Sequence, residues 1–312
     1  MSMATRVNYG RAVLLAAIML GITPAAQAAD TAVRVGSKID TEGSLLGNII
    51  LQVLESHQVK TVNKLQLGAT QVLRGAITAG EIDIYPEYTG NGAFFFSSEQ
   101  DKAWKDTNAG YQKVKQLDYD KNHIVWLSPA PANNTWTIAV RDELAKEQHL
   151  DSLADLSRYL QGGGTFKLAA SAEFIERPDA LPAFEKAYHF TLQQDQLLSL
   201  AGGDTAVTIK AAAEQTSGVN AAMAYGTDGP VAALGLHTLS DPAGVQPIYA
   251  PAPIIREAVL KQHPEIAQWL KPVFAALDTE TLQQLNASIA VEGQNASKVA
   301  ADFLKQKGFI PS

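Results

Sequence analysis

Five aromatic residues lie at the ends of predicted strands or in connecting segments, where their rings could bind a ligand. They are Tyr85, Tyr88, Trp136, Tyr225 and Tyr249. A cage of such rings presents electron-rich faces, which suit a quaternary ammonium ion because no hydrogen-bond acceptor can hold that group. At about 0.5–2 kcal/mol per ring, three or four rings supply a substantial part of the ~8 kcal/mol of micromolar binding. A single ring of this kind more often belongs to the core or to a rim, and it is the shared placement that indicates a binding site.

The residue types that catalysis or metal binding would need are poorly placed. The sequence has no cysteine, and its six histidines neither pair at zinc-ligand spacing nor lie in the aromatic segments. Carboxylates at the ends of elements more often cap helices or pair with arginine than act as acids and bases. We therefore expect no enzyme, no metal and no cofactor. The remaining enzymatic alternative is an exported hydrolase that uses Asp83, Glu87 or Asp228.

Two of the aromatic segments belong to a unit that occurs twice. Residues 83–92 read DIYPEYTGNG and residues 219–229 read VNAAMAYGTDG, and a shift of 137 positions superposes their final tyrosines. A shift of 135 positions places Thr70 on Thr205. Each copy has a Gly/Thr start, a helical pattern, a short strand and a tyrosine beside a glycine-containing turn. This duplication predicts two similar lobes that each offer an aromatic ring to a shared cleft.

Short apolar strands and longer helical patterns alternate along the chain. A strand at 33–35 is followed by helical spacing of apolar residues at 44–56, a strand at 62–67 and a helix at 70–79. This alternation is typical of a mainly parallel, doubly wound sheet. Further elements are expected as a polar helix at 97–117, a strand at 124–127, and helices at 257–277, 279–288 and 296–306.

Two proline-rich runs divide the chain. Residues 128–134 read SPAPANN and residues 246–253 read QPIYAPAP, and both are expected to be connectors. Two connectors would make the second lobe an insertion in the first. We place lobe 1 at residues 29–133 and 247–312, and lobe 2 at residues 134–246.

The N-terminal segment has the pattern of a secretory signal peptide over residues 1–28. Arg6 and Arg11 precede an apolar run at 12–22, and the small residues at 26–28 predict cleavage after Ala28. With no cysteine there is no lipid attachment site, so a soluble, exported protein of 284 residues is expected. Removal of the two arginines takes the formal net charge from −7 to −9. Such an acidic chain without a basic stripe is not expected to bind nucleic acid.

Six segments follow one another in a fixed order over nearly the whole mature chain. They are Ser37-Lys38 with Thr41-Glu42, YPEYTGN at 85–91, NNTW at 133–136, EFIERPDALPAF at 173–184, AYGTDG at 224–229 and PIYAPAPIIR at 247–256. Together they resemble the periplasmic osmoprotectant-binding proteins of bacterial ABC importers. The resemblance implies a type II periplasmic binding fold, in which two doubly wound α/β lobes are joined by a two-strand hinge and close on a trimethylammonium compound.

The resemblance also implies which side chains contact the ligand. The carboxylate-binding arginine of the family falls on Arg177, and a lysine that assists it falls on Lys38. A guanidinium can donate two hydrogen bonds to a carboxylate, and lysine adds a point charge. Arg177 could instead pair with Glu173, Glu176 or Asp179 on its own segment, and Lys38 could be solvated. The aromatic box of the family falls on Tyr88, Trp136, Tyr225 and Tyr249.

At three positions the sequence departs from what is common in the family. Trp136 stands where the family commonly has Tyr, Asn91 where it has Thr or an acid, and Gly43 where it has Gln. We retain Asn91 as a candidate ligand contact. Glycine betaine is expected as the ligand in preference to choline, because choline in a closed cleft would leave Arg177 without a counter-charge, and a buried unpaired charge is costly.

The resemblance implies a membrane permease and its cytoplasmic ATPase as partners. The mature protein is expected to be a monomer in the periplasm. Three alternatives stay open. The chain could be a receptor for choline, carnitine, ectoine or an amino acid, a hydrolase as above, or a chaperone-like interaction protein without a small ligand.

Overall fold

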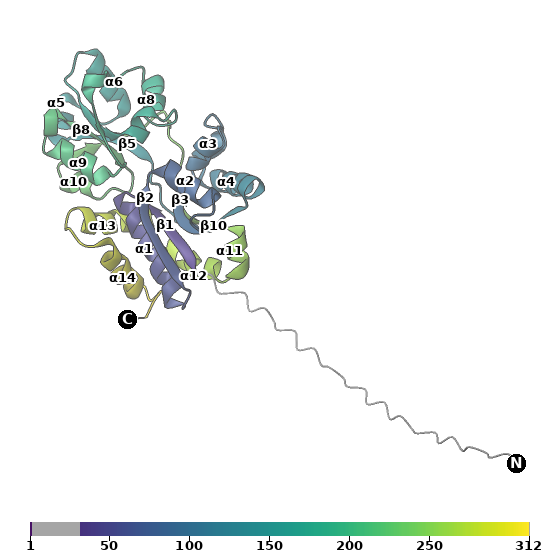
Figure 1. Ribbon diagram of the computed structural model, residues 1–312. Coiled ribbons are helices and arrows are strands. Elements are labelled where there is room, and N and C mark those ends of the chain that lie inside the picture. The colour runs from purple at the N-terminus through teal and green to yellow at the C-terminus, as the bar shows by residue number, and fades with distance from the viewer. Residues whose placement is uncertain (2–31, 312) are drawn as a thin grey trace. The chain divides into compact units, whose positions relative to one another are not determined.

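The computed structural model describes Met1 and residues 32–311, so the predicted signal peptide and its cleavage site after Ala28 lie outside the described residues apart from Met1. Residues 32–311 contain two five-stranded sheets (Figure 1). In the first sheet the strand order is β2-β1-β3-β10-β4. Its strands are β1 (Val33–Lys38), β2 (Thr61–Gly68), β3 (Ile84–Tyr88), β4 (Ile124–Trp126) and β10 (Pro251–Arg256).

The second sheet repeats this arrangement in the order β7-β6-β8-β5-β9. In the first sheet β1 pairs in parallel with β2 and β3, and β10 is antiparallel to both of its neighbours. In the second, β6 pairs in parallel with β7 and β8, and β5 is the antiparallel strand. The predicted α/β class with mainly parallel strands is confirmed, with one reversed strand in each sheet. The strands are β5 (Trp136–Arg141), β6 (Leu168–Ser171), β7 (Leu197–Leu200), β8 (Ala221–Tyr225) and β9 (Leu236–Thr238).

The duplication detected in the sequence is confirmed by the boundaries of the elements. A shift of 137 positions carries β3 onto β8 from first to last residue. A shift of 135 positions likewise carries α2 (Thr70–Thr78) onto α9 (Thr205–Ala213). The two sheets are therefore built from the same order of strand, helix and strand, and their edges should present equivalent positions to a ligand.

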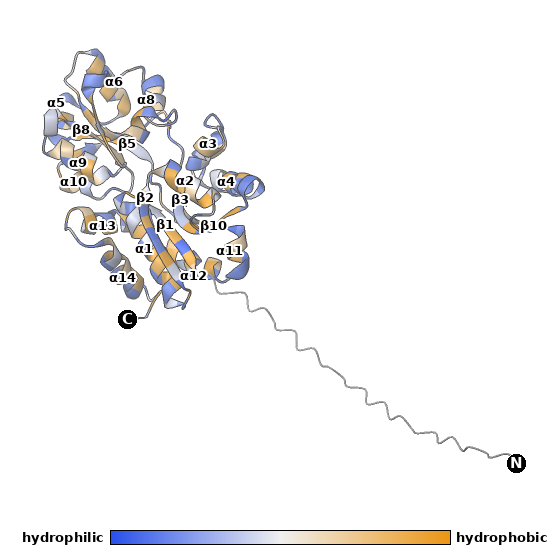
Figure 2. Cartoon of the chain, viewed as in Figure 1, coloured by the Kyte–Doolittle hydropathy of each residue, from blue (hydrophilic) through white to orange (hydrophobic). Residues whose placement is uncertain are grey.

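Helices cover the sheets with their apolar sides, and hydrophilic and hydrophobic segments alternate along them (Figure 2). The buried helix α1 (Thr41–Ser56) packs on β1 and β2 and also contacts α13 (Thr279–Ala290) and α14 (Ala296–Gln306). The remaining helices are α3 (Asn91–Phe95), α4 (Thr107–Asn122), α5 (Asp142–Gln148), α6 (Leu153–Gln161), α7 (Ala172–Glu176), α8 (Leu181–Tyr188), α10 (Pro230–Ala233), α11 (Glu257–Gln262) and α12 (Ile266–Ala275). Short 3₁₀ turns occur at Lys102–Lys105, Gln194–Gln196 and Thr216–Gly218.

Two predicted helices are wrong in extent, and each has a local cause. The polar helix expected at 97–117 is replaced by a 3₁₀ turn and α4, because Asp106 accepts a hydrogen bond from the Ala109 N–H and starts a new helix. The helix expected at 257–277 is split into α11 and α12 at residues 263–265, where Pro264 lacks the N–H that a continuous helix needs.

The second proline-rich run was expected to be entirely a connector, but its last three residues begin β10. Pro251 and Pro253 cannot donate to a sheet, yet their carbonyl groups accept hydrogen bonds from the N–H groups of Ala130 and Leu127. The chain passes between the two sheets twice, over residues 127–135 and 239–250. No helix in the described part of the chain is both long and apolar enough to cross a bilayer.

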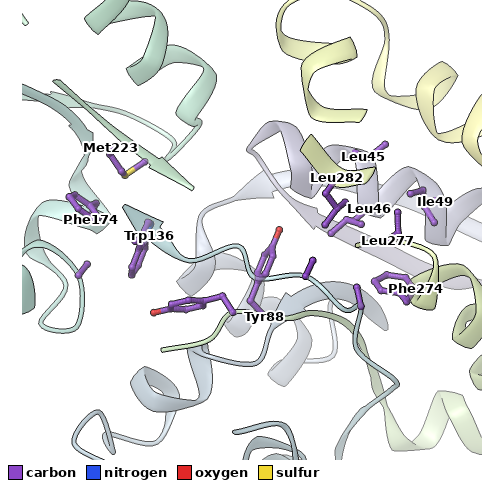
Figure 3. Packing of buried hydrophobic residues seen from close by; sticks show 14 of the residues in the cluster. Leu45, Leu46, Ile49, Tyr88, Trp136, Phe174, Met223, Phe274, Leu277 and Leu282 are labelled. Atoms are coloured by element: carbon purple, nitrogen blue, oxygen red, sulfur yellow. The ribbon is translucent and has the colours of Figure 1, made fainter. Parts of the chain in front are cut away.

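One cluster of buried apolar residues runs from α1 to the second sheet. Tyr88, Trp136 and Tyr249 belong to this cluster together with leucines of α1 and apolar residues of β6 and β8. Figure 3 shows Trp136 beside Phe174 at one end of the view and Tyr88 nearer to Leu46 and Leu282. Three of the candidate rings, Tyr88, Trp136 and Tyr249, are therefore anchored in this core.

Candidate functional site

The candidate site lies at the edge where parallel strands end in both sheets. β1 ends at Lys38, β3 at Tyr88 and β8 at Tyr225. Because β5 is antiparallel to β8, its first residue, Trp136, lies directly opposite Tyr225. Tyr249 precedes the reversed strand β10 by two residues, and so reaches the same edge. In open α/β sheets, ligands bind outside the carboxyl ends of the parallel strands.

Predicted residues from both sheets line one cavity. It includes six of the seven side chains expected to contact a ligand, and Arg177 is the exception. Tyr85, the fifth candidate ring, is fully buried beside Trp104 and Trp126 in a separate cluster and does not line the cavity. The lining residues are Lys38, Asp40, Ala69, Thr70, Tyr88, Asn91, Asn134, Trp136, Glu173, Gly202, Gly203, Tyr225 and Tyr249.

Trp136 is at the centre of the aromatic wall. Its ring centroid lies 6.3 Å from that of Tyr225, with 22° between the ring planes, and 5.7 Å from that of Tyr249. Phe174 contacts Trp136 edge-on from behind at 5.7 Å and is completely buried. Tyr88 lines the same cavity from the first sheet. The expectation that these four rings share one crevice is confirmed.

Tyr88 is held through its hydroxyl group by the buried carboxylate of Glu42. The hydroxyl donates to Glu42 Oε1 over 2.8 Å, and the same oxygen accepts from Asn134 Nδ2 over 2.9 Å. Burial raises the pKa of Glu42 above its usual value, although these hydrogen bonds oppose the rise. Burial also raises the pKa of Tyr88 well above its usual value, so the phenol remains a donor at physiological pH.

Lys38 and Asn91 are connected by a second buried carboxylate. Lys38 Nζ lies 2.8 Å from Glu87 Oε1 and 4.7 Å from the centre of the Tyr88 ring. Asn91 Nδ2 donates to the same oxygen of Glu87 over 2.6 Å. Asn91 Oδ1 in turn accepts from Arg177 Nη2 over 2.8 Å. Both ends of the Asn91 amide are thus occupied by protein groups, and the Lys38 charge is neutralised.

Arg177 already has its counter-charges inside the protein. Its guanidinium donates to both carboxylate oxygens of Asp179, over 2.6 and 2.9 Å, and to Glu173 over 2.9 Å. Burial lowers the pKa of Arg177, but the hydrogen bonds with Asp179 outweigh this effect and raise it above its usual value. The argument that choline would leave Arg177 without a counter-charge is therefore wrong. Arg177 also lies 4.6 Å from the centre of the Trp136 ring, behind the cavity wall.

Polar atoms in the cavity wall remain without a protein partner. Within residues 32–311, the hydroxyl of Tyr249 and Oδ1 of Asn134 are buried and make no hydrogen bond. The indole nitrogen Nε1 of Trp136 is also buried and makes no hydrogen bond of normal geometry, although the Tyr225 hydroxyl lies near it. A buried polar group left unpaired costs about 1–3 kcal/mol. Burial raises the pKa of Tyr249 well above its usual value, so its hydroxyl stays a donor. The wall therefore offers two donors and one acceptor to a ligand, beside faces suited to a cation.

Residues 31–306 match the family described as the substrate-binding domain of ABC-type glycine betaine transport systems. The chain belongs to this family. It is 75% identical over 300 residues to the glycine betaine-binding protein YehZ of Escherichia coli (strain K12), covering 96% of this chain and 97% of that protein. It is 32% identical to a glycine-betaine-binding protein of Pseudomonas aeruginosa, covering 92% and 91% of the two chains.

Solved structures give the same result for the fold. The structure of apo YehZ from Escherichia coli matches with a TM-score of 0.66 and 78% identity, covering 89% of this chain and 99% of that chain. A glycine betaine/carnitine/choline ABC transporter structure matches with a TM-score of 0.67 at 22% identity, over 89% and 99% of the chains, and supports the fold alone. A substrate-binding component of this family implies a betaine-type ligand and a permease partner.

The prediction from the sequence did not include several residues of the cavity wall. Asp40 carries no aromatic or glycine signature, and it accepts a hydrogen bond from the Gly43 N–H at the start of α1. Burial raises the pKa of Asp40 to about 6. The duplication could have revealed Thr70 and Gly203, because its 135-residue shift aligns residues 68–70 with residues 203–205, and each of these two segments contributes to the cavity wall.

Two positions at which we expect the chain to differ from the family, Gly43 and Trp136, lie in or beside the cavity wall. Gly43 lies against Lys38, and a Cβ at this position would approach the Lys38 carbonyl oxygen and Cβ to 2.9 Å. A larger residue would therefore displace Lys38 from its place in the wall. Trp136 provides both a ring face and an unpaired N–H, whereas a tyrosine would place a hydroxyl there.

The carboxylates that were considered as catalytic groups of a hydrolase make structural contacts instead. Asp83 pairs with Arg34 at 2.6 Å and with Arg256 at 2.9 Å, away from the cavity. Asp228 accepts from the backbone N–H of Tyr225 over 2.6 Å, and burial raises the pKa of Asp228 to about 8. Among the described residues, no cluster of three or more His, Asp or Glu side chains could hold a metal ion.

Proposed function

We propose that this protein is the periplasmic receptor for glycine betaine in an ABC importer and that it catalyses no reaction. The observation that carries the proposal is the single cavity that Tyr88, Trp136, Tyr225 and Tyr249 line from the edges of both sheets. The names of its relatives YehZ and the Pseudomonas protein support the same ligand. The rings receive the trimethylammonium group, and each contributes about 0.5–2 kcal/mol.

The carboxylate of glycine betaine accepts hydrogen bonds from Trp136 Nε1 and the Tyr249 hydroxyl. These two donors are buried, lie in the cavity wall and have no partner within residues 32–311. A carboxylate there replaces the water that each donor loses on burial, and hydrogen bonds to charged groups are worth about 1.5–3 kcal/mol. Arg177 acts indirectly, since its charge is held by Asp179 and Glu173 and its guanidinium covers the back of Trp136.

The ligand is captured between two lobes, lobe 1 at residues 29–133 and 247–312 and lobe 2 at residues 134–246. A ligand that contacts both lobes stabilises the closed arrangement to the extent of those contacts. The segments at 127–135 and 239–250 that link the two sheets act as the hinge. The permease, with its cytoplasmic ATPase, then accepts the ligand from the closed form. The receptor is a monomer in the periplasm, released from a signal peptide cut after Ala28.

Isothermal titration calorimetry with glycine betaine tests the proposal. Tyr225→Leu removes one ring from a partly exposed position and should raise Kd roughly 2- to 30-fold. Tyr119→Leu is the control, because Tyr119 lies exposed on α4 and does not line the cavity. No heat of binding with wild-type protein, or equal affinities for the two variants, would refute the cage. Turnover of any betaine ester by the protein would refute the claim that it is not an enzyme.

Choline is the second candidate ligand, since the internal pairing of Arg177 removes the main argument against it. Tyr249→Phe discriminates the two, because it keeps the ring and removes the unpaired hydroxyl. The variant should lose roughly 10- to 100-fold in affinity for glycine betaine and much less for choline. A thermal-shift screen that adds carnitine, ectoine and amino acids covers the remaining receptors, and a ligand at a hundred times its Kd should add ~2.7 kcal/mol of stability.

A further inference from the structure

Two amide side chains of α13 donate hydrogen bonds to the turn that follows Tyr225. Gln283 Nε2 donates to the Gly226 carbonyl oxygen over 3.0 Å, and Asn286 Nδ2 donates to the Thr227 carbonyl oxygen over 3.1 Å. The two amides are three residues apart and therefore lie on one face of the helix. They bind consecutive carbonyl groups immediately after the cage residue Tyr225.

Asn286 also reaches the group that holds the opposite cage residue. Its Nδ2 donates to Glu42 Oε2 over 2.7 Å, while Glu42 Oε1 accepts from the Tyr88 hydroxyl over 2.8 Å. Asn286 is 2% exposed and Glu42 is 4% exposed. One buried amide thus connects Tyr88, at the end of β3, with the turn behind Tyr225, at the end of β8.

The backbone geometry requires close contact at this place. A Cβ on Gly229 would lie 2.1 Å from the Gln283 carbonyl oxygen, so only glycine lets the turn approach α13 this closely. α13 packs on α1, which covers the first sheet, and also contacts α10, beside the second sheet. Figure 1 shows α13 next to α10, below the second sheet. The contact therefore joins elements that belong to different sheets.

We propose that Gln283 and Asn286 form an amide clamp that positions Tyr225 relative to Tyr88 and stabilises the arrangement in which both rings line the cavity. The proposal rests on the proposed function, because the cage is the element that the clamp positions. Neither side chain lines the cavity, so both are positioning residues. Since the clamp bridges the two sheets, it must break when they separate. It therefore slows ligand release.

Calorimetry and stopped-flow dissociation of glycine betaine from Gln283→Ala and Asn286→Ala test the clamp. Each variant should bind roughly 3- to 10-fold more weakly, with the loss expressed as faster dissociation. Gln283→Ala should change the melting temperature of the ligand-free protein little, whereas Asn286→Ala also removes a donor to the buried Glu42 and should lower that temperature. Gln284→Ala is the matched control. Gln284 is exposed, and its amide bonds to Glu280 on its own helix over 3.3 Å. A general loss of stability in the clamp variants with unchanged dissociation would overturn the proposal.

A measurement without ligand separates this proposal from the proposed function. The chain has no cysteine, so Lys146→Cys on α5 and Lys261→Cys on α11 give two unique sites for spin labels, both largely exposed. The clamp variants should shift the distance distribution between the labels relative to Gln284→Ala in the ligand-free protein. Identical ligand-free distributions would overturn the clamp. Absence of glycine betaine binding in the wild-type protein would overturn the proposed function, and the ligand-free distances would still decide on the clamp.

Discussion

Tyr88 and Tyr225 occupy equivalent positions in a duplicated unit, but the protein supports them in different ways. Tyr88 is 5% exposed, and its hydroxyl is bound to the buried Glu42. Tyr225 is partly exposed, and its support comes through the backbone, from Asp228 at its N–H and from α13 at the turn that follows. The backbone of the repeat is the same, while Glu42 and the amides of α13 come from outside the repeat and Asp228 lies within it.

This difference shows that the two copies of the unit keep the same position for the ring but use different contacts to support it. The residues at the end of β1 and just after β6 make the same point. Lys38 and Glu173 are related by the 135-residue shift, both line the cavity, and they carry opposite charges. Each is neutralised within its own half, Lys38 by Glu87 and Glu173 by Arg177. Equal substitutions in the two halves should therefore have unequal effects.

The largest difference is expected for removal of the whole side chain. Tyr88→Ala should lower the free energy of unfolding by about 3–5 kcal/mol, because a buried ring is lost and a donor to Glu42 disappears. Tyr225→Ala should lower it by about 1–2 kcal/mol, since this ring is partly exposed. Urea unfolding of the ligand-free variants measures both values. Equal losses would show that the two rings are supported alike.

Removal of the hydroxyl groups alone sharpens the comparison. Tyr88→Phe keeps the ring and deprives Glu42 of one donor, so a loss of about 1–3 kcal/mol in unfolding free energy is expected. Tyr225→Phe leaves the backbone contacts of its turn intact and should change stability by less than about 0.5 kcal/mol. Thermal unfolding at pH 7.5 measures the pair. A larger loss at Tyr225 would contradict the assignment of its support to the backbone.

Sequence patterns were sufficient to predict elements that occur in both copies of the repeat and helices whose ends have a local signal. The 137-residue shift located β3 and β8 together, and helix α14 was predicted with its observed ends. The β10 strand was missed because its prolines are typical of a connector. The pairing of Arg177 with Asp179 was one alternative that the sequence allowed, and only side-chain positions could select it. The Glu42–Asn286 contact joins residues 244 positions apart and leaves no local pattern.

A third comparison concerns a carboxylate that exists in one half only. The 135-residue shift places Asp40 on Ile175. Burial raises the pKa of Asp40 to about 6, so the folded protein binds a proton there more tightly than the unfolded chain, whose aspartates titrate near ~3.9. Its contribution to stability is therefore present below about pH 4 and is lost as the pH rises through about 6.

Asp40→Asn should remove this dependence. Asparagine still caps α1, and the variant should gain about 1 kcal/mol at pH 7.5, a value reduced by solvent at the partly exposed side chain. The control is Asp278→Asn at the exposed start of α13, where the hydrogen bonds with Thr281 lower the pKa of Asp278. This control should show no gain at pH 7.5. Melting temperatures from pH 4 to 8 give both profiles, and an unchanged slope in Asp40→Asn would contradict the assignment.

The smallest effect is expected from salt. Lys38, Arg177 and Glu173 are ion-paired inside each half, Lys38 with Glu87 and Arg177 with Glu173 and Asp179. Screening acts over ~8 Å at physiological ionic strength and affects exposed pairs far more than buried ones. Kd for glycine betaine should therefore change less than roughly tenfold between low and high salt, because ring faces and buried donors supply the binding free energy. A hundredfold loss of affinity would mean that unpaired charges hold the ligand. The salt dependence of Kd in Lys38→Met and in Glu173→Gln would then show which half of the protein contains those charges.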